Sequence, residues 1–290
     1  MLGGMENGEP QNRENRNDAD PLAMEKPRVF TCVGQRYAGT IGLQIYTLVI
    51  PLLVYDMSQS ALAMSGMRVM EFLPNVLLGM VAGVIVDRLN RKKVMVATIG
   101  VQWLAIALLV LLVFSQEIQL WSLFLLGFFF SSAGYFNGNA THSILPQLIQ
   151  REQLTEANAK MSFTGTLIRM IGPGLAGLIL AAGSFAGTLV IQFICITIAL
   201  ISMLFLPSPA VHKRASNQSF WADMKEGIQE LLQNKTLLTP TIATIFQNFA
   251  SSMVLGVLIF FAVDRLGSTE TEVGFMLSFG AVGGLLGASW

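Results

Sequence analysis

Long apolar stretches separated by short polar connections occupy most of this chain. They cover residues 37–55, 61–86, 94–114, 120–144, 161–182, 188–206 and 238–263, and a further one starts near Val273 and continues to Trp290. Most are roughly 18–25 residues long, the length that crosses about 30 Å of hydrocarbon at 1.5 Å per residue. Core helices of soluble proteins rarely run so far without charge. The pattern predicts an all-α, polytopic helical membrane protein embedded in a lipid bilayer.

Lysine and arginine are concentrated in alternate connections. The segment before the first stretch contains Arg13, Arg16, Lys26, Arg28 and Arg36. The second, fourth and sixth connections also contain basic residues: Arg88, Arg91, Lys92, Lys93, Arg151, Lys160, Lys213, Arg214, Lys225 and Lys235. The first, third and fifth connections contain no basic residue, and the seventh contains only Arg265. Because cytoplasmic loops are enriched in basic residues, the N-terminus and the basic connections are expected in the cytoplasm.

The connections also divide the chain into four parts. Residues 1–35 are expected to form a disordered cytoplasmic tail, and 36–206 an N-terminal six-helix transmembrane bundle. The segment 207–236 is unusually long, and its apolar residues recur at helical spacing: Phe220, Trp221, Met224, Ile228, Leu231 and Leu232. It is expected to be a cytoplasmic linker containing an amphipathic helix. Residues 237–290 would begin a second, C-terminal bundle.

Composition narrows the function classes. The chain is 53% hydrophobic and 12% charged, with no net charge, two cysteines and two histidines. This composition suggests no nucleic-acid partner and no metal or other cofactor. The chain lacks the glycine-rich loop that cradles nucleotide phosphates, and it gathers no nucleophile and base at a helix end. We therefore do not expect an enzyme or a transporter driven directly by ATP.

The strongest local motif lies at the end of the second stretch. Gly79 and Gly83 are four residues apart and so share a helix face that allows close approach. Asp87 follows where the helix leaves the membrane, and the basic residues Arg88, Arg91 and Lys92 follow it. Small-residue packing followed by basic anchors would explain the glycines and the charge. It would not explain the order of the residues from Gly83 to Lys92.

This order resembles the signature between helices 2 and 3 of the major facilitator superfamily, in which a glycine precedes Asp-Arg-x-x-Arg-Arg/Lys. Residues 168–177 similarly resemble the glycine–proline motif of its exporters, with Ala176-Gly177 in place of the final glycine pair. Leu53–Asp56, Leu145–Leu148 and Arg151–Asn158 add similarity to the macrolide-efflux and siderophore-exporter branch. The resemblance runs from about Gln35 to the end of the chain, which would then stop after about eight of twelve helices.

The resemblance implies a rocker-switch transporter, in which two bundles open alternately to each side. It implies that the motif from Gly79 to Lys92 helps to lock the cytoplasmic side. It also implies that Gly172, Pro173, Gly174 and Gly177 form a hinge and seal toward the outside. Ordinary glycine packing around a proline that loosens the helix is the alternative for the second motif.

Ionisable residues inside the apolar stretches are further candidates, because such residues usually have a role. Arg68 and Glu71 lie three residues apart on one helix face and can pair. This pair is either structural or takes part in proton or substrate coupling, with Glu71 as the titrating group. Arg169 lies one turn before Pro173. The fourth stretch has no basic residue before His142, so proton coupling is implied by the family alone.

Polar residues at helical spacing also mark the first, fourth and seventh stretches, which line the central cavity in this superfamily. Gln44, Asn139 and Gln247 are the candidates for cavity lining, and hydrogen bonding between helices is the alternative.

The sequence thus predicts a secondary-active transporter in a bacterial plasma membrane that exports a small amphipathic antibiotic or siderophore in exchange for protons. An uptake transporter of the same fold and a non-transporting membrane fragment are the alternatives. No oligomer is implied.

Overall fold

The computed structural model describes residues 21–148, 154–205 and 220–288, and this part of the chain contains helices and no strand. The helices are α1 (Pro21–Ser58), α2 (Ala61–Arg88), α3 (Arg91–Phe114), α4 (Leu120–Leu148), α5 (Leu154–Ala182), α6 (Phe185–Phe205), α7 (Phe220–Gln233), α8 (Lys235–Asp264) and α9 (Glu270–Ala288). The predicted all-α fold is confirmed.

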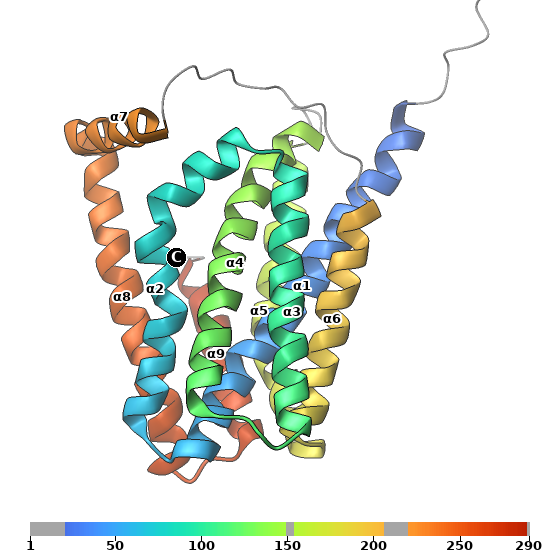
Figure 1. Ribbon diagram of the computed structural model, residues 1–290, viewed down its shortest axis with the longest axis vertical. Coiled ribbons are helices and arrows are strands. Elements are labelled where there is room, and N and C mark those ends of the chain that lie inside the picture. Colours follow the sequence, from blue (N-terminus) through green and yellow to red (C-terminus); the bar gives the residue numbers. More distant parts are fainter. Residues whose placement is uncertain (1–20, 149–153, 206–219, 289–290) are drawn as a thin grey trace, which may run out of the picture.

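Helices α1 to α6 form one bundle, against which α8 and α9 pack (Figure 1). Within the bundle, α1 contacts α5 and α6, α3 contacts α4 and α6, and α2 contacts α4. Helix α9 lies against α5, and α8 lies against α2. Helix α1 is the most enclosed of the apolar helices, with 56% of its apolar window buried. Its fully buried side chains, Leu48 and Ile50 among them, form the centre of the core.

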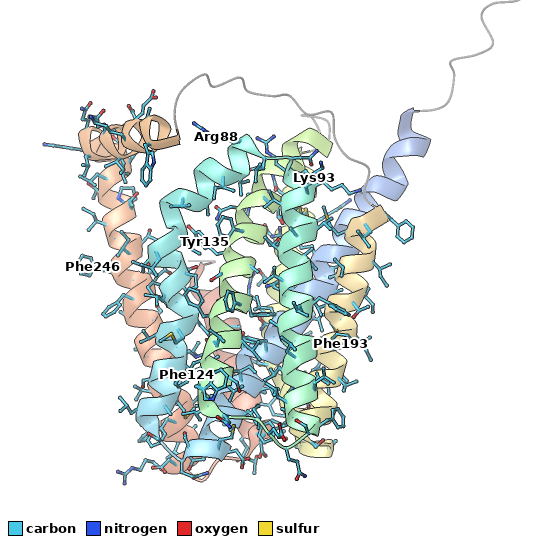
Figure 2. All side chains as sticks on the ribbon, in the orientation of Figure 1. Arg88, Lys93, Phe124, Tyr135, Phe193 and Phe246 are labelled. Atoms are coloured by element: carbon cyan, nitrogen blue, oxygen red, sulfur yellow. The ribbon has the colours of Figure 1, made fainter. Side chains whose placement is uncertain are left out.

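The two ends of the bundle differ. At one end, α2 passes to α3 through Arg88–Lys93, and α7 lies across the end of α8 (Figure 1). We call this the basic end. At the other end, short turns join α1 to α2, α3 to α4, α5 to α6 and α8 to α9. We call this the short-loop end. In Figure 2, Arg88 and Lys93 lie at the basic end and Phe124 near the short-loop end.

The outer faces of the helices are apolar. Within the described residues, five helices are long and apolar enough to cross a membrane: α1 from Arg36, α3, α4, α5 from Asn158, and α6. On α6, Ile191, Ile194, Ile198 and Ile201 are all 38–51% exposed and follow the helical repeat. On α8, Phe246 points away from the bundle (Figure 2). A continuous apolar face of this kind is soluble only in lipid.

Polar side chains fix several helix starts. Ser60 accepts a hydrogen bond from the backbone N–H of Ala63 at the start of α2, and Asn90 accepts one from Lys93 at the start of α3. Such caps satisfy N–H groups that have no partner inside the helix. Asn90 occupies one of the variable positions of the Asp87–Lys92 signature, so the tight turn between α2 and α3 also contains a cap.

The first helix starts earlier than expected. We expected a disordered tail over 1–35, but α1 begins at Pro21, and residues 1–20 lie outside the described part. Once a helix exists, each added residue gains one backbone hydrogen bond, so an apolar span extends readily into good helix formers such as Leu22–Lys26. Proline is also well suited to the first helical position.

Helix α7 occupies part of the segment 207–236, as the helical spacing suggested, and residues 206–219 lie outside the described part. It contacts α8 and α2. Trp221 and Leu232 on α7 are 68% and 60% exposed, so much of its apolar surface is uncovered in this structure.

Candidate functional site

A cavity lined by polar and apolar side chains lies inside the six-helix bundle. Its volume is about 450 Å³, and residues of α1, α2, α3, α4 and α6 line it. It follows α4 from Phe130 to His142, about 18 Å at 1.5 Å per residue. Arg36 begins the membrane-spanning part of α1, and His142 lies in the last two turns of α4, so one end of the cavity is directed toward the basic end of the bundle. The volume is typical of small-molecule sites.

The ion pair between Arg68 and Glu71 lies on the α2 wall of this cavity. Arg68 Nη1 donates to Glu71 Oε2 at 2.8 Å, and Arg68 Nη2 donates to the backbone carbonyl of Thr47 on α1 at 3.1 Å. The two side chains are 14% and 12% exposed. The pairing expected from their spacing is therefore present, and it also ties α2 to α1.

Not every polar atom of the Arg68–Glu71 pair makes a hydrogen bond to the described residues. Arg68 Nε and Glu71 Oε1 are buried and have no hydrogen-bond partner among the described residues. The same holds for the hydroxyl of Tyr46, for Asn137 Oδ1 and for both polar atoms of the Gln192 amide. All five side chains line the cavity. Buried polar groups are almost always hydrogen-bonded, so this concentration of unused donors and acceptors indicates a space that takes up water or a polar ligand.

Neighbouring side chains hold this polar wall in place. The Tyr46 ring stacks on Phe130 of α4 with centroids 4.2 Å apart and an interplanar angle of 15°. Gln192 is 1% exposed on α6.

The sequence analysis did not select Tyr46, Asn137 or Gln192. A signal existed for Gln192, because it is the only residue of α6 that carries a side-chain amide.

The structure describes only some of the side chains of the signature between α2 and α3. Lys92 Nζ donates to the backbone carbonyl of Leu204 at 3.0 Å, which ties the turn to the end of α6. Arg88 is exposed and Arg91 is half-buried, and each interacts with other groups. A Cβ at Gly79 would lie 3.4 Å from the Tyr135 hydroxyl of α4, whereas none of the described neighbours lies within 4 Å of a Cβ at Gly83. The side chain of Asp87 lies outside the described part. A locking role for this motif stays a prediction.

Helix α5 packs closely on α9 through its glycine–proline segment. A Cβ at Gly177 would meet the backbone oxygen of Glu270 at 2.6 Å, and one at Gly274 would meet that of Pro173 at 2.5 Å. The backbone N–H of Gly174 donates to Ser278 Oγ at 2.9 Å. Only glycine permits this approach of two helices. The contact lies in the half of α5 nearer the short-loop end.

The same end holds a second contact between α1 and α8. The Tyr55 hydroxyl donates to Asp264 Oδ1 at 3.4 Å, and the Tyr55 ring meets Phe260 edge-on with centroids 6.0 Å apart. Together with the α5–α9 contact, it joins α8 and α9 to the six-helix bundle at the short-loop end.

The other predicted residues lie outside the cavity. On α5, Gly172 is pressed against Gln44 of α1, whose amide donates to the backbone carbonyl of Arg169 at 3.4 Å. The exposed Arg169 guanidinium donates to Thr166 Oγ1 at 3.3 Å. Asn139 donates to the carbonyl of Tyr135 within α4 at 2.9 Å, and Gln247 is exposed on α8. Lining of a cavity between two bundles stays a prediction for Gln44, Asn139 and Gln247.

Comparison with known proteins decides the family. The sequence profile of the transmembrane secretion effector family, a branch of the major facilitator superfamily, matches residues 21–290. The chain belongs to this family. It is a family of membrane transporters, as the relatives described next indicate.

The chain is 24% identical over 267 residues to macrolide efflux protein A of Streptococcus pyogenes, with 90% of this chain and 66% of that protein covered. It is 30% identical over 218 residues to the enterobactin exporter EntS of Shigella boydii, with 72% of this chain and 50% of that protein covered. The chain thus spans between half and two thirds of the length of these relatives.

The fold also matches a solved transporter. A bacterial homologue of the human lysosomal transporter Spinster, solved in an inward-facing and unoccupied conformation, superposes with a TM-score of 0.67 at 14% sequence identity. The match covers 91% of this chain and 60% of the other. At this identity the likeness establishes the fold alone.

Proposed function

We propose that the protein is a secondary-active exporter of a small amphipathic compound, coupled to proton entry and working by alternating access. The efflux relatives in the same family support the direction of transport. The basic end would lie in the cytoplasm, in keeping with the distribution of lysine and arginine. In that orientation the structure has its cavity on the cytoplasmic side and its short-loop end outside.

The Arg68–Glu71 pair is the observation that carries the coupling. Ionisable groups inside a membrane are costly and usually functional. Glu71 keeps one buried oxygen that has no hydrogen-bond partner among the described residues, and the residue lines a cavity large enough for water. Protonation there would remove the negative partner of Arg68 and free its guanidinium. One proton thereby changes the charge of the cavity and a contact between α1 and α2.

Transport also needs the short-loop end to open. Opening would separate α5 from α9 and α1 from α8, at Gly177, Gly274 and the Tyr55–Asp264 hydrogen bond. Because the glycine contacts are made by backbone atoms, the two helices can part and return without rearranging side chains. The seal implied by the exporter-type motif on α5 is part of this proposal.

Proton coupling can be tested in everted membrane vesicles from cells that express the chain. The vesicles are acidified inside, and a macrolide or enterobactin is added while a pH-sensitive dye is followed. We expect substrate addition to dissipate the gradient, and we expect Glu71→Gln to abolish the response. Glutamine removes the negative charge but keeps an oxygen that can accept the hydrogen bond from Arg68. Alanine would also remove that oxygen, and breaking a buried pair in this way costs about 3–5 kcal/mol.

The matched control is Glu117→Gln, which neutralises an exposed carboxylate between α3 and α4. It should behave like the parent protein, and Glu71→Asp should retain part of the response. Coupled export that survives Glu71→Gln would falsify the role of Glu71. A chain that dissipates no gradient with any substrate would count against proton-coupled export itself.

A further inference from the structure

The side chains that line the cavity inside the six-helix bundle differ in charge, and their charges do not cancel. Among the described residues that line it, Glu71 is the single carboxylate, and Arg68 is already paired with it. Arg36 then remains as a second positive charge in the lining, and His142 lines the same cavity. The arginines and the carboxylate of the described lining together carry one net positive charge, so a negative charge on a ligand would be favoured there.

The deeper part of the cavity is suited to hydrogen bonding. Gln192 is 1% exposed and offers a donor and an acceptor that no described residue uses. Tyr46 is 4% exposed and offers its hydroxyl, and Asn137 offers an acceptor. The Tyr46–Phe130 stack and Ile196 supply an apolar wall beside these groups. Small-molecule sites have this combination of a few convergent polar groups on an apolar wall.

We propose that this cavity is a binding site for a compact amphipathic organic anion. The apolar part of the ligand would lie along Phe130 and Ile196, its hydrogen-bonding groups would meet Gln192 and Tyr46, and its negative group would face Arg36. Cations are disfavoured, because the single carboxylate among the described residues that line the cavity is engaged by Arg68. The inference rests on the proposed export function for its biological meaning, since it names the charge class of the substrate.

Two probes with the same ring and opposite charge test the proposal. Purified protein in detergent is titrated at equilibrium with tritiated 2-naphthoate and, separately, with the cation 2-naphthylmethylammonium. We expect saturable binding of the anion and at least about tenfold weaker binding of the cation, the size of effect that one charge-assisted hydrogen bond supplies. Because no gradient is applied, binding is measured whether or not the protein transports, so failure of this proposal is distinguishable from failure of export.

Variants then locate the bound anion. Arg36→Gln should weaken 2-naphthoate binding about tenfold and reduce the preference over the cation. Gln192→Leu should weaken both probes. Lys93→Gln removes an exposed charge outside the cavity at the same end of the bundle and should change neither affinity. Each variant is first shown to be monodisperse. Equal or tighter binding of the cation, no saturable anion binding by folded protein, or an unaltered affinity in Arg36→Gln would each overturn the proposal.

Discussion

Arg68 and Glu71 lie well inside α2, and the residues next to them in the helix sequence are largely apolar. Their three-residue spacing allows a pair within one helix turn, but the spacing does not say what else the guanidinium meets. In the structure its second nitrogen bonds to the Thr47 carbonyl of α1. A helix carbonyl near a proline is available for such a bond, because Pro51, four residues later, has no N–H to donate. The pair therefore also joins two helices.

Lys92 illustrates a residue whose role depends on a distant element. Its ammonium group donates to the carbonyl of Leu204, one of the last carbonyls of α6, which have no partner within the helix. A positive charge there also interacts favourably with the negative end of the helix dipole. Lys92 thus stabilises the end of α6 as well as belonging to the signature turn.

We predict that Lys92→Met lowers the free energy of unfolding by about 0.5 kcal/mol, the usual size of a surface charge at a helix end. Lys93→Met, at an exposed neighbouring position, should have no measurable effect. Reversible unfolding in mixed micelles measures both. Equal destabilisation by the two variants would show that the contact with α6 contributes nothing.

At the scale of elements, the contact between α5 and α9 brings the backbones of two helices close together. Backbone atoms on both sides would lie within 2.6 Å of an added Cβ at Gly177 or Gly274. Backbone atoms cannot move aside as a flexible side chain can. An added Cβ at either glycine would therefore force the two helices apart. By contrast, a Cβ at Gly172 would meet the side chain of Gln44, which can move.

We predict that Gly274→Ala shifts the protein away from the conformation with a closed short-loop end. Overpacking of this kind costs about 1–3 kcal/mol. Spin labels at Ser184→Cys and Ser268→Cys, in a background with Cys32 and Cys195 replaced by serine, measure the separation across that end. The population at longer distances should rise.

The matched control is Gly280→Ala on the same helix, where an added Cβ meets none of the described atoms within 4 Å. It should leave the distance distribution as in the parent. If the two variants gave the same distribution, the glycine contact would not be what closes this end.

At the scale of the whole molecule, the apolar outer faces and the two unlike ends define how the bundle would sit in a membrane. The basic turn between α2 and α3 and helix α7 lie at one end, and short turns with few charges lie at the other (Figure 1). Membrane insertion retains basic loops on the cytoplasmic side.

We therefore predict opposite labelling of two single cysteines in intact cells, again without Cys32 and Cys195. Glu117→Cys, at the short-loop end, should react with a membrane-impermeant maleimide. Lys93→Cys, at the basic end, should react only after the cells are permeabilised. The reverse pattern would place the basic end outside and contradict the proposed direction of access.

The sequence by itself determined the class of fold, and the physical reason is strong. In lipid every backbone N–H and C=O must be satisfied within its own segment, so a long apolar stretch has to be helical. The starts of α2 and α3 were also determined locally, by the N-cap residues Ser60 and Asn90. The family signature depended likewise on a few residues in order, from Gly83 to Lys92.

Only the tertiary structure decided where the candidate site lies. Tyr46, Asn137 and Gln192 belong to three different helices, and each taken alone reads as one polar residue in an apolar span. Helix packing brings them onto one cavity and leaves at least one polar atom of each without a hydrogen-bond partner among the described residues, which the spacing of residues along the chain could not show. The start of α1 and the α5–α9 contact were decided in the same way. Helix propagation and backbone approach depend on neighbours far apart in the chain, whereas the pattern of apolar residues records only what is close in sequence.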